Sequence, residues 1–175
     1  MTPNGQEAVA PGDAFLELYD RALPEVYGYL VRRCGSDAVA EDLTAEVFLA
    51  GVAALQRGTL QQPTVGWLVA VARHKLVDHW RRTAREQRGL AVVAGRRPAD
   101  DGDWVDHLEE GPALAALARL GPHHRSALTL RYLDGLPVPE VAQHLGRTVH
   151  ATEALLVRAR LAFRRSYGEE TDDAS

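Results

Sequence analysis

Apolar side chains recur every three or four positions over most of the chain, beginning with residues 13–34. This spacing gathers them on one face of a helix. Asp13 stands where a side chain can cap the helix start. Pro24 removes one backbone donor and is expected to kink or interrupt the segment. The pattern therefore predicts a first amphipathic helix that is distorted near its middle.

A second helix is predicted after Gly35, which stops the first, with Ser36 or Asp37 as its start. Its apolar positions fall on two stripes. One stripe holds Leu43, Val47, Ala50 and Ala54, and the other holds Phe48, Val52 and Leu55. A helix with two apolar stripes packs between neighbours, which indicates a helical bundle.

A third helix, from about Thr64 to Arg88, is predicted after a loop that contains Gly and Pro. Its apolar positions Leu68, Ala72 and Leu76 are expected to face inward. Another face carries a polar, mainly basic stripe made of His74, Asp78, Arg81 and Arg85. This helix is therefore expected to present one face to the core and a basic face to its surroundings.

Residues 89–112 have no sustained period and are rich in Gly, Pro and Asp, so a linker is predicted there. Shorter helical stretches follow at 113–120, 123–133, 138–145 and 149–166. The expected fold class is all-α, with two small helical domains joined by a flexible acidic linker. The predicted parts are a disordered N-terminus at 1–12, a first domain at 13–88, the linker at 89–112, a helix-turn-helix domain at 113–166 and an acidic tail at 167–175.

The 175-residue chain has a formal net charge of -4, but its charges are unevenly distributed. Residues 73–97 hold eight Lys and Arg against two acidic residues, and residues 119–165 hold eight Arg against three. Residues 98–112 hold six acidic residues and no Lys or Arg. Two basic blocks separated by an acidic one indicate two polyanion-facing surfaces; the plainer interpretation is a set of solvated helix faces.

Composition and missing motifs narrow the function classes. The single cysteine, Cys34, excludes an internal disulfide framework and a multi-cysteine metal site, and is expected to be a small buried hydrophobe. No apolar run is long enough for a membrane span, and residues 1–12 do not resemble a secretory signal, so we expect a soluble, cytoplasmic protein without direct membrane insertion. No glycine-rich phosphate loop, HExxH motif or paired metal-ligand spacing is present. We therefore expect no catalytic residues, no metal and no cofactor, and a protein that is not an enzyme.

The segment "VPEVAQHLGRTVHATEALLVRA", residues 138–159, has the pattern of a helix-turn-helix. Ala142 is small where two helices cross closely, and Gly146 falls in the turn that needs a left-handed backbone. A plain α-hairpin is the alternative. The core shared by its helices is expected to contain Val141, Leu145, Val149 and Leu156.

If this motif reads DNA, the exposed N-terminal residues of its second helix meet base edges. The residues expected there are Thr148, His150, Ala151, Thr152 and Leu155. Glu153 either accepts from a cytosine amino group or turns away from the groove. Arg147, Arg158 and Arg160 are expected mainly to hold phosphates.

The basic stripe of the third helix suits an unpaired strand, because Arg side chains follow the backbone while a loop pocket or an aromatic surface accepts bases. Trp67 and Trp80 lie close to this stripe in the sequence. The alternative is that both Trp side chains belong to the core and that the Arg run is a solvated helix end.

Three segments, in this order, resemble a sigma-70 family RNA polymerase sigma factor of the extracytoplasmic-function (ECF, group 4) type. The segment "AEDLTAEVF" is similar to region 2.2, and "GWLVAVARHKLVDHWRR" is similar to regions 2.3 and 2.4. The stretch from "ALARLGPHHRSALTLRYLDGLP" through the helix-turn-helix is similar to region 4. The resemblance covers residues 13–88 and 112–165.

The resemblance implies a promoter-recognition subunit with two DNA-reading faces. Region 2.2 would bind the β′ clamp helices of RNA polymerase core through Glu41, Asp42, Leu43, Glu46 and Phe48. The third helix and the loop before it would open and read the -10 element through Thr64, His74, Asp78, Arg81, Arg82 and Arg85. Region 4 would dock on the β flap and read the -35 element through Arg147, Thr148, His150, Ala151, Thr152, Glu153, Leu155, Arg158 and Arg160.

The implied partners are RNA polymerase core, promoter DNA as duplex and melted single strand, and an anti-sigma factor, with the acidic linker threaded toward the polymerase active centre. The chain departs from the group at His74, where Asn is common, and at 153–155, where a Lys-Ser-Arg-like run is common. Both departures bear on which promoter sequence is read. The alternative function is a stand-alone helix-turn-helix regulator that binds duplex DNA. A pure adaptor would lack the basic stripes.

Overall fold

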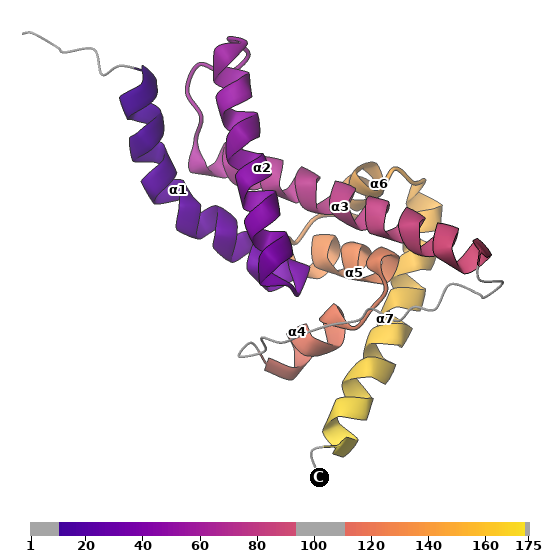
Figure 1. Cartoon of the computed structure of the whole chain (residues 1–175). Coiled ribbons are helices and arrows are strands. Elements are labelled where there is room, and N and C mark those ends of the chain that lie inside the picture. Colours follow the sequence, from indigo (N-terminus) through magenta and orange to yellow (C-terminus); the bar gives the residue numbers. More distant parts are fainter. Residues whose placement is uncertain (1–10, 94–110, 174–175) are drawn as a thin grey trace, which may run out of the picture.

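The computed structural model describes residues 11–93 and 111–173, and every regular element in these two ranges is helical (Figure 1). This confirms the all-α fold class. The elements are α1 (Pro11–Cys34), α2 (Asp37–Gln56), α3 (Val65–Val93), α4 (Gly111–Ala118), α5 (Pro122–Leu128), the π-helical turn η1 (Thr129–Leu133), α6 (Val138–Leu145) and α7 (Val149–Asp173). None of the helices in this described part is long and apolar enough to cross a membrane.

Helices α1, α2 and α3 pack against one another as an N-terminal bundle. The start of α2 is as predicted: Gly35 has a left-handed backbone (φ +67°), and the side chain of Ser36 accepts a hydrogen bond from the Val39 amide at 3.5 Å. Helix α1 runs through Pro24, so of the kink and the interruption expected there, the interruption is wrong. It also begins at Pro11, so Asp13 lies inside the helix and does not precede it.

The core of the bundle follows the predicted periodicity. Val47 of α2 and Leu68, Ala72 and Leu76 of α3 are fully buried, as the inward-facing positions require. Trp80 is also buried in this core, and Trp67 is half-buried against it, which favours the core interpretation for both rings. Helix α3 continues to Val93, five residues beyond the predicted helix end at Arg88 and into the segment 89–112 that was predicted as a linker. The rest of that linker, residues 94–110, lies outside the described residues.

Helices α4 to α7 form a C-terminal domain with its own apolar cluster. The helix expected at 123–133 is divided, because the backbone changes from α-helical in α5 to π-helical in η1 at Thr129. Helix α7 runs to Asp173, beyond the predicted domain end at 166. Val149 was expected in the core but is exposed, whereas Leu156 is buried as predicted.

The two domains share apolar packing. Leu130 of η1 and Val141 of α6 are fully buried in the cluster that fills the N-terminal bundle. Helix α3 contacts both α5 and α6, and Figure 1 shows these two short helices beside α3. The C-terminal domain is therefore docked on the bundle, on the side that carries the basic stripe.

Candidate nucleic-acid and partner interfaces

The basic stripe of α3 has the composition expected for a strand-binding face. Thr64 directly precedes α3, and its hydroxyl accepts a hydrogen bond from the Trp67 amide at 3.1 Å. Within the stripe, His74, Asp78 and Arg85 are exposed and Arg81 is half-buried, and the neighbouring Arg82 is exposed as well. Arg81 Nη1 lies 3.4 Å from Asp78 Oδ1, an exposed pair that contributes little to stability.

Part of this stripe contacts the helix-turn-helix. Arg81 Nη2 donates a hydrogen bond to the backbone carbonyl of His144, at the end of α6. The rings of His74 and His144 lie 4.8 Å apart between centroids. Burial lowers the pKa of His144, and the neighbouring His74 and Arg73 lower it further. Two residues expected to read the -10 element are thus engaged with the other domain.

The turn of the helix-turn-helix has the predicted geometry. Gly146 adopts a left-handed backbone (φ +61°) directly after α6, which is the conformation that favours glycine. Ala142 is buried where α6 packs on α7. The hydroxyl of Thr148 accepts a hydrogen bond from the Ala151 amide at 3.2 Å and caps the start of α7.

The residues predicted to meet DNA on α7 fall into two groups. Those that are exposed are Arg147, Thr148, His150, Glu153, Arg158 and Arg160, and Ala151 is half-buried. Thr152 and Leu155 are buried, and this corrects their assignment as base-reading side chains. Leu155 packs in the apolar cluster of its own domain, and the Thr152 hydroxyl donates to the Thr148 carbonyl at 3.0 Å. Both lie on the inner face of the helix.

The residues of α2 that the family resemblance assigned to polymerase binding divide in the same way. Glu41 and Asp42 are exposed, and Glu46 pairs with Lys75 through a 2.9 Å contact. Leu43 and Phe48 are buried in the bundle core, so they support the helix and do not present side chains to a partner. Leu49 is strongly exposed on α2 and was missed by sequence reasoning, although an apolar residue outside both predicted stripes was a usable signal.

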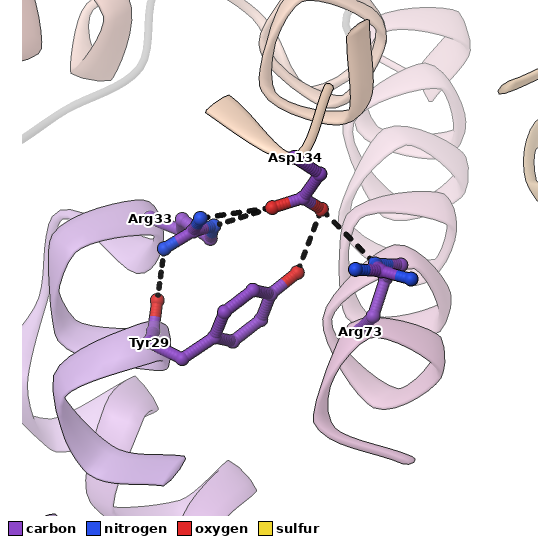
Figure 2. A network of polar contacts seen from close by, with 4 residues as sticks. All are labelled: Tyr29, Arg33, Arg73 and Asp134. Atoms are coloured by element: carbon purple, nitrogen blue, oxygen red, sulfur yellow. Dashed lines mark hydrogen bonds and ion pairs between the residues drawn. The ribbon is translucent and has the colours of Figure 1, made fainter. Parts of the chain in front are cut away.

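A buried carboxylate connects the two domains (Figure 2). The side chain of Asp134, between η1 and α6, is 1% exposed. Arg33 donates to its Oδ1 from Nε at 3.1 Å and from Nη2 at 2.8 Å. Tyr29 Oη and Arg73 Nε donate to its Oδ2 at 2.8 and 3.2 Å. Burial and the Asp134 charge raise the pKa of Tyr29, so the phenol stays protonated and donates.

A second polar contact joins α5 to the end of α1. Arg125 Nη1 donates to the Cys34 carbonyl at 3.1 Å, and its Nε donates to the Leu117 carbonyl at 3.3 Å. Burial raises the pKa of the Cys34 thiol to about 12, so it is protonated at neutral pH. Cys34 is therefore a buried structural residue, as expected.

Two cavities flank the docked domains. The first, of about 530 Å³, lies between α3 and the turn of the helix-turn-helix and is mainly basic. Its lining residues are Asp78, Arg81, Arg85, Arg88, His123, Leu145, Gly146 and Arg147. The arrangement gathers guanidinium groups from both predicted DNA faces, which suits a polyanion.

The second cavity is an apolar groove of about 540 Å³ on the C-terminal domain. Its lining residues are Ala113, Leu114, Leu117, Leu128, Tyr132, Leu133, Arg160, Phe163 and Arg164. Tyr132 and Leu133 remain exposed at this groove. An apolar groove with basic side chains at its margin suits a protein partner with an apolar segment. Sequence reasoning missed it because its walls come from α4, α5, η1 and α7.

Both domains match known family models. The family described as Sigma-70 region 2 matches residues 18–86, and the family described as Sigma-70, region 4 matches residues 111–163. These ranges correspond to the N-terminal bundle and the C-terminal domain.

Curated relatives carry the same two regions. The ECF RNA polymerase sigma factor BldN of Streptomyces coelicolor is 36% identical over 84% of this chain, which spans 58% of BldN. The RNA polymerase sigma factor CarQ of Myxococcus xanthus is 32% identical, over 74% of this chain and 75% of CarQ. The ECF RNA polymerase sigma factor SigC of Mycobacterium tuberculosis is 30% identical, over 83% of this chain and 79% of SigC.

Two solved structures are also similar. The sigma factor RpoE of Bartonella quintana, in complex with the anti-sigma factor NepR, has a TM-score of 0.52 at 19% identity, over 87% of this chain and 95% of RpoE. This is a likeness of fold. A chain of the RsbN-BldN complex is 31% identical over 89% of this chain and 92% of its own length, with a TM-score of 0.35.

Proposed function

Because this chain belongs to the extracytoplasmic-function group of the sigma-70 family, we propose that it directs RNA polymerase core to specific promoters as a dissociable initiation subunit. The observation that carries the proposal is the combination of two family regions, each with its own group of exposed basic side chains, in one chain. A stand-alone regulator needs only one such surface. Two surfaces serve a promoter with two separated elements.

The exposed face of α3 reads and opens the -10 element. His74, Asp78, Arg82 and Arg85 line one side of the helix, with Thr64 at its start. Arg side chains bind the phosphates of the melted strand, and the loop before α3 receives its bases. Arg81 joins this face when its contact with His144 is broken.

The helix-turn-helix reads the -35 element as duplex. Thr148, His150 and Ala151 occupy the first turn of α7 or precede it, where side chains meet base edges. Arg147, Arg158 and Arg160 hold phosphates and fix the register. Glu153 is exposed and selects against bases that offer it only acceptors.

RNA polymerase core engages both domains away from these DNA faces. The exposed side of α2, with Glu41, Asp42 and Leu49, binds the β′ clamp helices. The apolar groove between α4, η1 and α7 receives the β flap. Because core polymerase supplies part of the DNA affinity, a subunit with net charge -4 still functions at promoters.

The protein acts in the cytoplasm as a binding subunit and not as an enzyme. An anti-sigma factor is a further partner, since RpoE of Bartonella quintana is bound by the anti-sigma factor NepR. For this chain that partnership rests on family membership.

Run-off transcription tests the proposal. Purified core polymerase is assayed with and without the full chain on a library of genomic promoter fragments, with folding of the chain verified by circular dichroism. We expect new initiation sites that depend on the protein. Unchanged initiation on every fragment, together with duplex binding in the absence of core, would favour the stand-alone regulator instead.

A further inference from the structure

We propose that the basic cavity between α3 and the turn of the helix-turn-helix binds a small phosphorylated molecule with at least two adjacent phosphate groups, such as pyrophosphate or a nucleoside diphosphate. This binding is a property of the free chain. Its consequence, competition between the ligand and promoter DNA, rests on the proposed function.

The residues that line this cavity carry a strong excess of positive charge. Its guanidinium groups come from two domains: Arg81, Arg85 and Arg88 from α3, and Arg147 from the turn. Among the described lining residues, the carboxylate of Asp78 is the one negative charge. The three arginines of α3 follow Asp78 at intervals of three, four and three residues, so they share one face of the helix. The cavity is therefore electropositive on both walls.

Three of these guanidinium groups are available to a ligand. Arg85, Arg88 and Arg147 are exposed, and within residues 11–93 and 111–173 none of them forms an ion pair with a carboxylate. Arg85 and Arg88 each donate from Nε to a carbonyl of their own helix, at 3.3 and 3.1 Å, which leaves their terminal nitrogens for a ligand. A phosphate anion among these cations offsets their mutual repulsion and accepts charge-assisted hydrogen bonds.

Arg81 holds the two walls of the cavity together. Its Nη2 donates to the backbone carbonyl of His144, and its Nη1 lies 3.4 Å from Asp78 Oδ1. A Cβ built on Gly146 would lie 3.2 Å from the same Nη2, so the turn and α3 are in close contact here. The two backbones that carry the other guanidinium groups are thus positioned without a ligand, which lowers the entropic cost of binding one.

The size and lining of the cavity favour a small ligand. Its volume of about 530 Å³ lies within the range of roughly 300–1,000 Å³ for small-molecule sites, and a DNA duplex cannot enter such a space. Guanidinium groups bind phosphate oxygens in a bidentate manner, so several of them together favour a ligand with more than one phosphate. His123 and Leu145 complete the lining with a ring and an apolar surface of the kinds on which a base packs.

A ligand in this cavity withdraws cations from both predicted DNA faces. Arg85 belongs to the face proposed for the -10 element and Arg147 to the face proposed for the -35 element, and both line the cavity. The bound phosphates therefore compete with the DNA backbone for these two side chains. Arg88 lines the cavity but belongs to neither proposed DNA face, so it allows the ligand site to be tested by itself.

Isothermal titration calorimetry on the full-length chain tests the site. The probes are pyrophosphate, inorganic phosphate, ADP and GDP, at one ionic strength and without divalent cations. Arg88→Gln and Arg147→Gln each remove one lining charge. Arg82→Gln is the matched control, because Arg82 is exposed on the same helix as Arg88 and does not line the cavity. Circular dichroism and urea denaturation verify that each variant is folded.

We expect the wild type to bind pyrophosphate more tightly than inorganic phosphate. Arg88→Gln and Arg147→Gln are each expected to weaken pyrophosphate binding about tenfold, because each removes a charge-assisted contact. Arg82→Gln is expected to change this affinity by less than about twofold, because solvent and salt screen its charge. Tighter binding of ADP or GDP than of pyrophosphate would identify a nucleotide as the ligand class, and binding that is no tighter would identify the phosphate groups alone. If Arg88→Gln fails to fold, Arg147→Gln decides the outcome.

The proposal is overturned if none of the four probes binds at millimolar concentration. It is equally overturned if inorganic phosphate binds as tightly as pyrophosphate, or if Arg82→Gln loses as much affinity as Arg88→Gln. The last result would mean that pyrophosphate is attracted by the general charge of α3 and not by the cavity.

Competition with DNA is measured by fluorescence anisotropy of a labelled single-stranded DNA oligonucleotide. Pyrophosphate is expected to displace it from the wild type more effectively than sulfate at equal ionic strength, and Arg88→Gln is expected to abolish this difference. Equal displacement by the two anions from the wild type would refute the competition. A chain that binds pyrophosphate through Arg88 but supports no run-off transcription would refute the proposed function and keep the ligand site.

Discussion

Truncation of Leu133 to Ala is expected to weaken binding to RNA polymerase core by about fivefold. Leu133 lines the apolar groove and is 43% exposed, so a docked partner has this part of its surface left to cover. Complete burial of a Leu side chain contributes about 1.5–3 kcal/mol, and covering the remaining part therefore contributes roughly 1 kcal/mol. A loss of that size corresponds to about a fivefold change in the dissociation constant.

Leu161→Ala is the matched control for this measurement. Leu161 lies on α7, is 51% exposed and does not line the groove. Both variants are titrated with core polymerase in a competition assay against labelled wild type, and urea denaturation verifies that neither loses stability. The assignment of the groove would be refuted by an equal loss in the two variants. It would equally fail if Leu133→Ala bound core as tightly as the wild type.

Three further predictions address the DNA faces and the packing of the two domains. Arg82→Ala with Arg85→Ala, which removes two exposed cations of α3, is expected to impair promoter opening, measured by permanganate footprinting, much more than core binding; equal losses would contradict the assignment. Acidification is expected to expand the free protein, because a protonated His144 is disfavoured where the two domains meet. Burial, His74 and Arg73 lower the pKa of His144, and the charges of Asp134 and Glu140 oppose this shift only in part. The stability given by the neutral imidazole is complete above the ordinary histidine pKa and is lost as the pH falls through the lowered pKa. His144→Gln should therefore flatten the dependence of the radius of gyration on pH. Gly146→Ala is expected to lower the free energy of unfolding in urea by about 1–2 kcal/mol because of its left-handed backbone, whereas Gly66→Ala, in the first turn of α3, should not lower it.

Local patterns were enough to predict the elements and much of the core. Gly35 and Ser36 marked the boundary between α1 and α2 because a left-handed residue and a capping hydroxyl are local requirements of helix ends. Gly146 marked the turn of the helix-turn-helix for the same reason. The boundary errors also have a local cause: Pro24 and Gly89 weaken a helix but do not end it when the flanking residues pack on neighbours.

Errors in the candidate site arose where a residue was assigned a binding role from the family resemblance alone. The helical face on which that residue lies was not taken into account. Thr152, Leu155, Ala159 and Ala162 follow one another at intervals of three, four and three residues, so they share the inner face of α7. The spacing was visible in the sequence and would have excluded Thr152 and Leu155 from base reading. Leu43 and Phe48 of α2 were misassigned in the same way.

The buried polar cluster around Asp134, in contrast, had no signal in the sequence. Tyr29 and Asp134 are 105 positions apart, and Asp134 follows a π-helical turn that no periodicity predicts. In the segment "DGLP" an Asp before a Gly has an ordinary interpretation as a turn residue. Only the docking of the second domain turns it into the partner of two guanidinium groups.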